Sequence, residues 1–431
     1  MRRCLAAMGL ALAMWMLADV PASAQEKGIG DFPKLSAKTD WPWWRGPTRN
    51  GIASEQPVPT KLSATDNVVW KAAVPGRGHS SPTVVGQKVF LTTADESQQV
   101  HYVLAFDRGS GEALWQTEIN RGGFPDKNHP KNTEATPTVA SDGEKLFATF
   151  FHHEKIEAVA LDFEGKILWR QVAGPFNPQA FEYGYAPSPL IYRKNLIVSG
   201  EYDGKSFLTA LDRKSGKLAW RTPRPEKITF SSPIVANVGG KDHLFLSGSE
   251  KVAAYNPNTG KPLWAADGTT AATCGSMVWD GDIVFASGGY PKAETIAVKA
   301  DRTGKVLWRN NQKCYEQSML AHDGYLYALT DNGVIYCWRG ADGSEMWKER
   351  LEGPVSASPV LAGGHIYWAN EAGKLYVFRP NPDKFDLVEE NQLGTDAFAS
   401  PAICGGQIFL RVGDSSSGSR KETLYCFGSK K

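Results

Sequence analysis

The sequence predicts an all-β chain that folds as an eight-bladed β-propeller with four-stranded antiparallel blades. Three observations support this fold: a hairpin motif that recurs along the chain, a small-residue–Pro step before each recurrence, and an unpaired strand near the N-terminus. A lone two-stranded hairpin is marginal in water, so a series of hairpins must stack on one another to be stable.

The recurring motif is clearest at residues 206–220, SFLTALDRKSGKLAW, where two strand-like runs flank a turn that contains Asp212 and Gly216. Bulky residues two positions apart predict the strands, and Asp and Gly suit the tight turn. In every copy a Gly stands four positions before the closing Trp. The other copies end at Trp115, Trp169, Trp264, Trp308 and Trp347. Copies in register over this length predict one repeated structural unit.

Each unit also has a front half, which begins with a small residue followed by Pro or Met. Pro suits the first residue of a strand, where no donor to the ladder is needed. The steps are Ser81-Pro82, Thr136-Pro137, Ser188-Pro189, Ser232-Pro233, Ser276-Met277, Ser318-Met319, Ser358-Pro359 and Ser400-Pro401. One unit is then four short strands, and eight steps predict eight blades.

The last unit lacks an outer strand, because it stops after the strand at residues 424–427. A Trp-bearing strand around Trp70 precedes the first unit and has no hairpin partner of its own. We expect this N-terminal strand to complete the last blade, since closing the ring removes exposed strand edges. The propeller then occupies residues 68–431.

Residues 1–24 are typical of a secretory signal peptide, with a basic start, a short apolar stretch and Ala22-Ser23-Ala24 before the cleavage position. An uncleaved anchor is the alternative, but the apolar stretch is short for a bilayer. We expect a periplasmic or secreted protein without a transmembrane anchor. Residues 25–67 form an extension with Trp41, Trp43 and Trp44. This Trp-rich segment either covers one end of the domain or offers an aromatic platform to a ligand.

Composition narrows the function classes. The chain has 48 basic and 46 acidic residues, and this balance gives no indication of general nucleic-acid binding. No Ser-His-Asp spacing, phosphate loop, zinc signature or Cys-x-x-Cys-His haem motif occurs. Signal removal would leave an odd number of cysteines, of which Cys274 and Cys314 lie in adjacent blades and could form a disulfide or stay free.

The A-x-D-x-x-[ST]-G-K-x-x-W copies, the eight units and the completing N-terminal strand resemble the pyrroloquinoline-quinone (PQQ)-type propeller repeat family from about Trp41 to the C-terminus. The opening WPWWRGPTRNG resembles an exported bacterial branch of it. Quinoprotein dehydrogenases, similar in fold, bind the quinone and Ca²⁺ in the central funnel. The outer-membrane assembly lipoprotein, similar in blade sequence, binds partner proteins. This chain lacks the vicinal Cys pair of many quinoprotein alcohol dehydrogenases and the lipid-bearing Cys of the assembly factor.

In this architecture the first strand of each blade borders the channel, so the residue three before each Pro or Met step should lie near one mouth. This ring is His79, Glu134, Ala186, Phe230, Cys274, Glu316, Ser356 and Phe398. Apolar walls with a few polar groups are typical of a ligand pocket, although a solvated funnel wall is the alternative. The predicted ligand-binding residues are Arg77, His79, Glu134, Tyr185, Phe230, Cys274, Glu316 and Phe398. Glu134 and Glu316 should face each other across the mouth.

Two long joins, residues 116–134 and 171–185, should form a recognition rim with His129, Phe124, Phe176 and Phe181. The sequence thus predicts a monomeric binding or scaffold module of the cell envelope, with a protein or small-molecule partner at its funnel face. No catalytic residue or metal ligand is predicted. The alternative is a PQQ-dependent oxidoreductase that holds PQQ and Ca²⁺ in the funnel.

Overall fold

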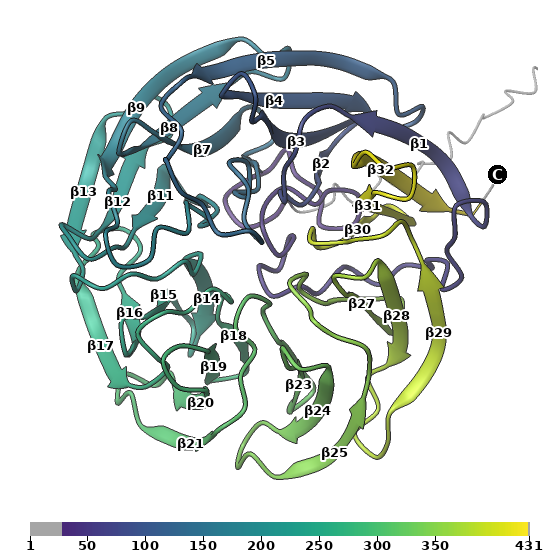
Figure 1. Ribbon diagram of the computed structural model, residues 1–431. Helices are drawn as coiled ribbons and strands as arrows, with labels where there is room; N and C mark the ends of the chain where they lie inside the picture. The colour runs from purple at the N-terminus through teal and green to yellow at the C-terminus, as the bar shows by residue number, and fades with distance from the viewer. Residues whose placement is uncertain (1–27, 430–431) are drawn as a thin grey trace, which may run out of the picture.

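The computed structural model describes residues 28–429, so the expected signal peptide lies outside the described residues. Its strands form eight four-stranded antiparallel sheets that follow one another around a central axis (Figure 1). This is the predicted eight-bladed propeller. Between residues 28 and 429 no helix is long and apolar enough to cross a membrane.

Each blade contributes one strand to each of four concentric layers. The innermost strands are β2 (Thr83–Val85), β6 (Ala140–Ser141), β10 (Leu190–Tyr192), β14 (Ile234–Val238), β18 (Val278–Asp280), β22 (Leu320–His322), β26 (Val360–Ala362) and β30 (Ala402–Cys404). The second strands are β3 (Lys88–Asp95), β7 (Leu146–His152), β11 (Asn195–Gly200), β15 (Lys241–Gly248), β19 (Ile283–Gly288), β23 (Tyr325–Leu329), β27 (His365–Ala369) and β31 (Gln407–Asp414).

The third strands are β4 (Val100–Asp107), β8 (Lys155–Leu161), β12 (Phe207–Asp212), β16 (Lys251–Tyr255), β20 (Glu294–Lys299), β24 (Val334–Arg339), β28 (Lys374–Arg379) and β32 (Lys421–Gly428). The outermost strands are β5 (Ala113–Arg121), β9 (Ile167–Pro175), β13 (Leu218–Pro223), β17 (Pro262–Asp267), β21 (Val306–Asn310), β25 (Glu345–Arg350), β29 (Asp386–Gln392) and β1 (Val68–Val74).

The strand β1 closes the ring as predicted. It pairs antiparallel with β32, from Val68 opposite Phe427 to Val74 opposite Glu422, and so becomes the outer strand of the last blade. Figure 1 shows this N-terminal strand lying beside the C-terminal one. The first and last segments of the propeller therefore share one sheet, which ties the ends of the ring together.

The Gly and Trp of the repeat act between blades rather than within one blade. Six outer-strand tryptophans pack on the turn glycine of the following blade, and a Cβ at Gly216 would lie 2.9 Å from Cε3 of Trp169. The pairs are Trp70 with Gly111, Trp115 with Gly165, Trp169 with Gly216, Trp220 with Gly260, Trp264 with Gly304 and Trp308 with Gly343. Trp70 belongs to this series, so the closing strand docks on the first blade like its counterparts.

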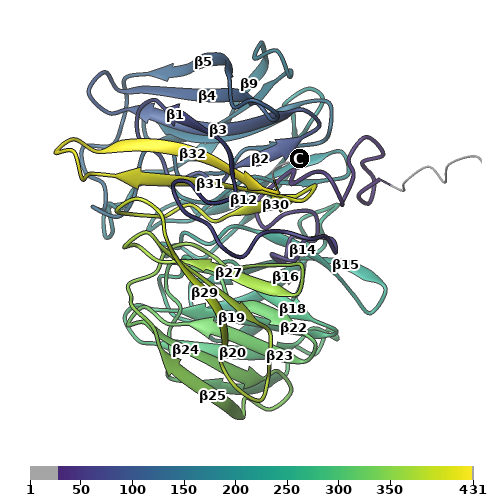
Figure 2. The same cartoon turned by 90° about the vertical axis from the view of Figure 1, so that its right-hand side faces the viewer.

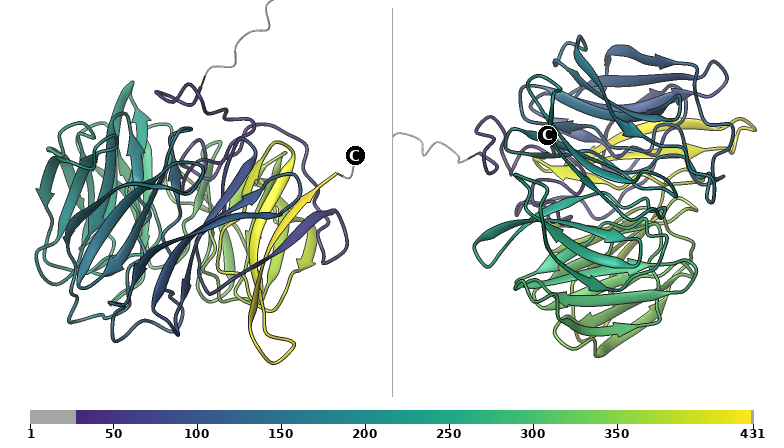
Figure 3. Two further views of the ribbon diagram at one scale, coloured as in Figure 1. Left: turned by 90° about the horizontal axis from the view of Figure 1, so that it is seen from above. Right: turned by 90° about the vertical axis from the view of Figure 1, so that its left-hand side faces the viewer.

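The Trp-rich N-terminal segment covers one end of the channel. Trp41 exchanges backbone hydrogen bonds of 2.8 and 2.9 Å with Val84, the middle residue of the innermost strand β2. Arg45 is 3% exposed and donates to the carbonyl oxygens of Met319 and Pro359 at 2.9 and 2.7 Å. Figures 2 and 3 show this purple segment on one face of the disc. The channel is therefore covered where the innermost strands end.

Candidate functional site

A ring of hydroxyl groups surrounds the axis where the innermost strands begin. In seven of the eight ring residues the backbone N–H donates to the side-chain oxygen of the next blade's ring residue, at 2.8–3.1 Å. The donor–acceptor pairs are Ser81–Thr138, Thr138–Ser188, Ser188–Ser232, Ser276–Ser318, Ser318–Ser358, Ser358–Ser400 and Ser400–Ser81. The Oγ of Ser276 accepts a bond of 2.9 Å from Nε1 of Trp44. The ring thus joins the blades and also holds the covering segment.

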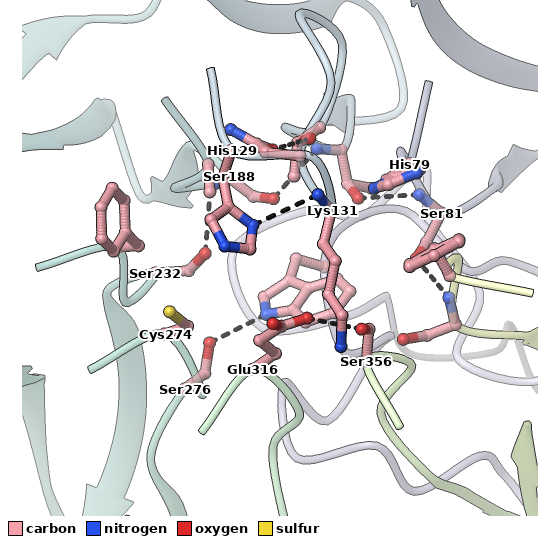
Figure 4. Close-up of a pocket in the computed structure, with 18 of the residues that line it drawn as sticks. His79, Ser81, His129, Lys131, Ser188, Ser232, Cys274, Ser276, Glu316 and Ser356 are labelled. Atoms are coloured by element: carbon pink, nitrogen blue, oxygen red, sulfur yellow. Dashed lines mark hydrogen bonds between the residues drawn. The ribbon is translucent and has the colours of Figure 1, made fainter. Parts of the chain in front are cut away.

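A cavity of about 160 Å³ lies on this ring, at the end of the channel that faces the long loops (Figure 4). Trp44 lines it from the covered end, and His129, Lys131 and Tyr183 line it from the loops between β5 and β6 and between β9 and β10. The residues two positions before the hydroxyl ring form its wall: His79, Thr136, Ala186, Phe230, Cys274, Glu316, Ser356 and Phe398. One residue of every blade therefore reaches the cavity.

The structure brings together five of the eight predicted ligand-binding residues. These are His79, Phe230, Cys274, Glu316 and Phe398, and all of them line the cavity. Arg77, Glu134 and Tyr185 do not line it. Ligand binding by the five that converge here stays a prediction.

Glu134 lies outside the cavity because the register predicted for the second blade differs by two residues from the register in the structure. Ala140 pairs with Phe147 as Thr83 pairs with Phe90, which makes Thr138, and not Thr136, the counterpart of Ser81. The position equivalent to His79 is then held by Thr136. Glu134 accepts a hydrogen bond of 2.7 Å from Asn128 instead, so the expectation that it faces Glu316 across the mouth is wrong.

The other two residues have structural partners. Tyr185 is 3% exposed, and its hydroxyl donates to the carbonyl oxygen of Ser199 at 3.0 Å. Its ring packs on Phe176, which is 1% exposed and hence belongs to the core rather than to the rim. Arg77 bridges to the backbone of Ala94, and its guanidinium lies 3.9 Å from Glu96. These contacts place Arg77 at the edge of the first blade.

Lys131 crosses the cavity from the loop between β5 and β6 toward Glu316 and Ser356 (Figure 4). Its Nζ lies 2.8 Å from Oε1 of Glu371, whose side chain is 10% exposed. Burial alone would lower the pKa of Lys131, but the hydrogen bond to Glu371 and the charges of the neighbouring acidic groups raise it overall. The cavity therefore contains a firmly protonated ammonium group.

Ser356 links the two carboxyl groups, with its Oγ 2.5 Å from Glu316 and 2.7 Å from Glu371. A hydroxyl carries a single proton and can donate to one of them, so the other contact needs a protonated carboxyl as donor. Burial raises the pKa of Glu316, and the nearby charges of Glu371 and Asp331 raise it further. We therefore assign this proton to Glu316, which leaves Glu371 as the carboxylate that faces Lys131.

Aromatic rings form much of the remaining wall. The imidazole of His79 stacks on Phe398 with ring centroids 4.3 Å apart. Burial lowers the pKa of His79 well below its usual value, and the charges of Arg77 and Arg411 lower it further, so this ring is neutral. Tyr183 lies over Phe230, with centroids 6.2 Å apart, and meets His129 edge-on at 4.7 Å. The cavity thus combines aromatic faces with a single carboxylate–ammonium pair.

Replacing Glu134 with Gln should make the protein more stable at pH 8 and leave its stability almost unchanged at pH 4. Burial raises the pKa of Glu134 to about 7, above an ordinary value near 4.5. The folded state then binds this proton more tightly, so its stabilisation is present below pH 4.5 and is lost as the pH rises through 7. Gln keeps the acceptor for Asn128, and the expected gain at pH 8 is about 1–3 kcal/mol. Urea denaturation of both proteins across this range measures it; parallel pH profiles would contradict the prediction.

The residues of the cavity do not fit PQQ and Ca²⁺. Calcium takes six or more oxygen ligands, mostly from carboxylates and carbonyls. Within residues 28–429 no group of three or more His, Cys, Asp or Glu side chains could hold a metal ion, and the carboxyl group of Glu316 already bonds Ser356. The quinone is a planar tricarboxylate, whereas the lining contains one ammonium group, already paired with Glu371. A volume of about 160 Å³ is also below the range usual for ligands of that size.

The five cysteines in the described part of the chain, Cys274, Cys314, Cys337, Cys404 and Cys426, are all free. Of the two alternatives for Cys274 and Cys314, the structure thus has separate thiols. Cys274 lines the cavity, whereas Cys314 is buried in the core between two blades. Burial raises the pKa of both thiols well above their usual value, so neither is an activated nucleophile.

The fold and the cavity define a class of protein: a closed eight-bladed propeller with one axial site, an architecture shared by enzymes and by binding proteins. A sequence profile described as outer membrane protein assembly factor BamB matches residues 101–322 and 292–381, and the chain belongs to this family of PQQ-like propellers.

The chain is similar in sequence both to an assembly factor and to enzymes. The outer membrane protein assembly factor BamB of Burkholderia pseudomallei is 24% identical over 75% of this chain and 92% of its own length. The tetrathionate hydrolase of Acidithiobacillus ferrooxidans is 22% identical over 71% of this chain and 65% of its own length. The 1-butanol dehydrogenase (quinone) of Thauera butanivorans is 26% identical over 56% of this chain, but over only 39% of the enzyme.

Two solved structures are similar in fold. A europium-containing methanol dehydrogenase superposes with a TM-score of 0.68 at 12% identity, covering 92% of this chain and 99% of that one. BamB from Moraxella catarrhalis superposes with a TM-score of 0.59 at 14% identity, covering 84% and 98%. At these identities the likeness concerns the fold alone.

Proposed function

We propose that the protein is an exported binding module of the cell envelope, which holds a protein or small-molecule partner at its cavity face. The observation that carries this proposal is the shape of the axial cavity. One end of the channel is covered by residues 41–53, which bond to several innermost strands. The other end gives access to a wall to which every blade contributes one side chain. A site built in this way is typical of recognition rather than of a passive channel.

Two further observations favour binding over quinone-dependent oxidation. The residues at the axis do not provide the oxygen ligands and cations that Ca²⁺ and a tricarboxylate quinone need. The relative from Burkholderia pseudomallei that spans most of this chain is named as an assembly factor and not as an enzyme. An exported protein also agrees with the signal peptide that residues 1–24 predict.

Site-specific photo-crosslinking in the source cells tests the proposal. A photoreactive phenylalanine replaces Tyr183, which is 36% exposed at the rim, and in a control it replaces Leu218, which is 59% exposed on the outer strand β13. We expect a discrete adduct from position 183 that the control does not give. Equal labelling from both positions would contradict the proposal.

A titration with PQQ tests the alternative. The purified protein is titrated with the quinone in the presence and absence of Ca²⁺, and quinone absorbance and fluorescence are followed. We expect no saturable binding under either condition. Saturable, Ca²⁺-dependent binding that the change Glu316→Gln abolishes would support the oxidoreductase instead.

A further inference from the structure

The cavity already contains an alkylammonium group, which the protein supplies itself. The side chain of Lys131 leaves its loop, crosses the cavity and places Nζ 2.8 Å from Glu371 (Figure 4). We infer that this cavity is a binding site for an external alkylammonium group, in which Lys131 is an internal occupant that the ligand displaces. This inference rests on the proposed function, because it names the chemistry of the ligand that the cavity face would hold.

The charges around Lys131 favour a cation. Glu316, Glu371 and Asp331 all lie close enough to act on its ammonium group. Asp331 has a second cation nearby, since Lys313 lies 3.4 Å from it. Glu316 is protonated and shares the hydroxyl of Ser356 with Glu371, so Lys131 is the cation that compensates the carboxylate of Glu371. When Lys131 leaves, the carboxylate of Glu371 loses its cation, so the site can accept another ammonium group in its place, whereas an anion would meet this uncompensated carboxylate.

The walls suit the same ligand. An ammonium group on an alkyl stem gains from aromatic faces, which attract the cation, and from apolar surface, which covers the stem. Five aromatic side chains line the cavity: Trp44, Tyr183, Phe230, Tyr315 and Phe398. Seven of the backbone N–H groups of the hydroxyl ring are occupied by bonds around the ring. The lining thus offers an anion few free donors.

Lys131 can leave without disturbing the propeller. It lies on the loop between β5 and β6, and its side chain is 37% exposed, so the loop side of the cavity is open to solvent. Glu371, Ser356 and Glu316 come from the sixth and seventh blades and hold each other without it. The cavity of about 160 Å³ lies beside this side chain, which leaves room for a ligand stem to enter while Lys131 swings out.

Chemical rescue of a Lys131→Ala variant tests the inference. The substitution removes the ammonium group and its stem, and n-propylammonium supplies the same atoms. We expect calorimetry to show n-propylammonium binding to this variant at least about tenfold more tightly than to wild type, because the internal competitor is gone. n-Propanol, which has the same shape without the charge, should not bind. Adding Glu371→Gln to Lys131→Ala should abolish the binding of the amine.

Lys374 offers a matched control. It also pairs with two glutamates, Glu352 and Glu390 at 2.8 and 2.6 Å, but on the surface of the seventh blade and away from the cavity. Lys374→Ala should respond to n-propylammonium no more than wild type does. Equal binding by the two variants, or equal binding of amine and alcohol by Lys131→Ala, would overturn the inference. Lys131→Ser leaves the same space empty and replaces Lys131→Ala if that variant does not fold.

The ammonium group could belong to a free amine or to a lysine of a partner protein. A Gly/Ser hexapeptide with one central lysine, and the same peptide with that lysine acetylated, distinguish the two sources. Binding of the unmodified peptide to Lys131→Ala indicates a protein partner, and binding of n-propylammonium without the peptide indicates a free amine. A crosslink at position 183 without amine binding would contradict only the inference that the cavity binds an alkylammonium group. Amine binding without a crosslink would contradict only the proposed function.

Discussion

Removing residues 1–74 is expected to abolish cooperative folding of the propeller. The deletion takes away β1 and leaves the edge of β32 unpaired, which favours aggregation through that edge. It also removes Trp70, which is 7% exposed and donates to the carbonyl oxygen of Arg108 at 2.8 Å. The loss of one large core aromatic costs about 3–5 kcal/mol, a large share of the about 5–15 kcal/mol that holds a typical domain together. Thermal unfolding followed by circular dichroism should show no sharp transition.

A permuted chain separates the strand from the rest of the N-terminal segment. The end of β32 lies beside the start of β1, since the N–H of Gly428 donates to the carbonyl oxygen of Asn67 at 2.9 Å. A chain that starts at residue 75 and continues after Gly428 through a short Gly-rich turn into residues 67–74 therefore restores the blade without residues 1–66. We expect this chain to regain a cooperative transition. An unchanged melting temperature after the simple deletion would show that closure by β1 is not needed.

The repeat predicted the fold well because its signal comes from packing that every blade needs. Trp169 and Gly216 stand in register in the sequence since each blade must accept the indole of the preceding one. The sequence pattern placed Trp and Gly in one hairpin, and the structure shows that they serve two different interfaces. The role of the strand around Trp70 was predicted because the last unit has no outer strand of its own. Trp70 packs on Gly111 in the same way as the other outer-strand tryptophans pack on the glycine of the next blade.

The cavity was predicted less well because the same signal fails in the second blade. Thr136-Pro137 has the same sequence form as the step that begins the other units. However, the strand pairing of the following hairpin shows that Thr138, and not Thr136, occupies the position of the ring hydroxyl. A comparison of hairpin turns rather than of proline positions would have given this register. It would have brought Thr136 into the predicted ring and excluded Glu134.

Lys131 and Glu371 were missed for a different reason. Lys131 lies in a long loop of one blade, where no repeat exists to compare it with. Glu371 did leave a signal: Asp331-Asn332-Gly333 and Glu371-Ala372-Gly373 occupy equivalent turns after β23 and β27. Acidic residues at equivalent turns of adjacent blades indicate a shared acidic rim, but only the structure shows that one ammonium group reaches across to it.

A buried ion pair at the closure of the ring leads to the second large effect. Arg411 on β31 and Glu422 on β32 form an ion pair in which both side chains are 2% exposed. Arg411 also donates to the carbonyl oxygen of Thr92 at 2.7 Å and so joins the last blade to the first. The pair therefore lies at the seam that β1 closes. No sequence pattern marks it, because the two charges occur in one blade only.

Glu422→Ala should destabilise the protein by about 3–5 kcal/mol, because it leaves the guanidinium of Arg411 buried without its counterion. Arg420 keeps a partner, since its guanidinium lies 2.7 Å from Asp396. Glu118→Ala is the control, as it removes the glutamate of an Arg–Glu pair whose side chains are 53% and 45% exposed, and its effect should be much smaller. The double change Arg411→Met and Glu422→Leu should recover stability, since it removes both charges and fills the space. Denaturant midpoints measure all three variants; a loss in Glu422→Ala no larger than in the control would mean that the pair contributes nothing to closing the ring.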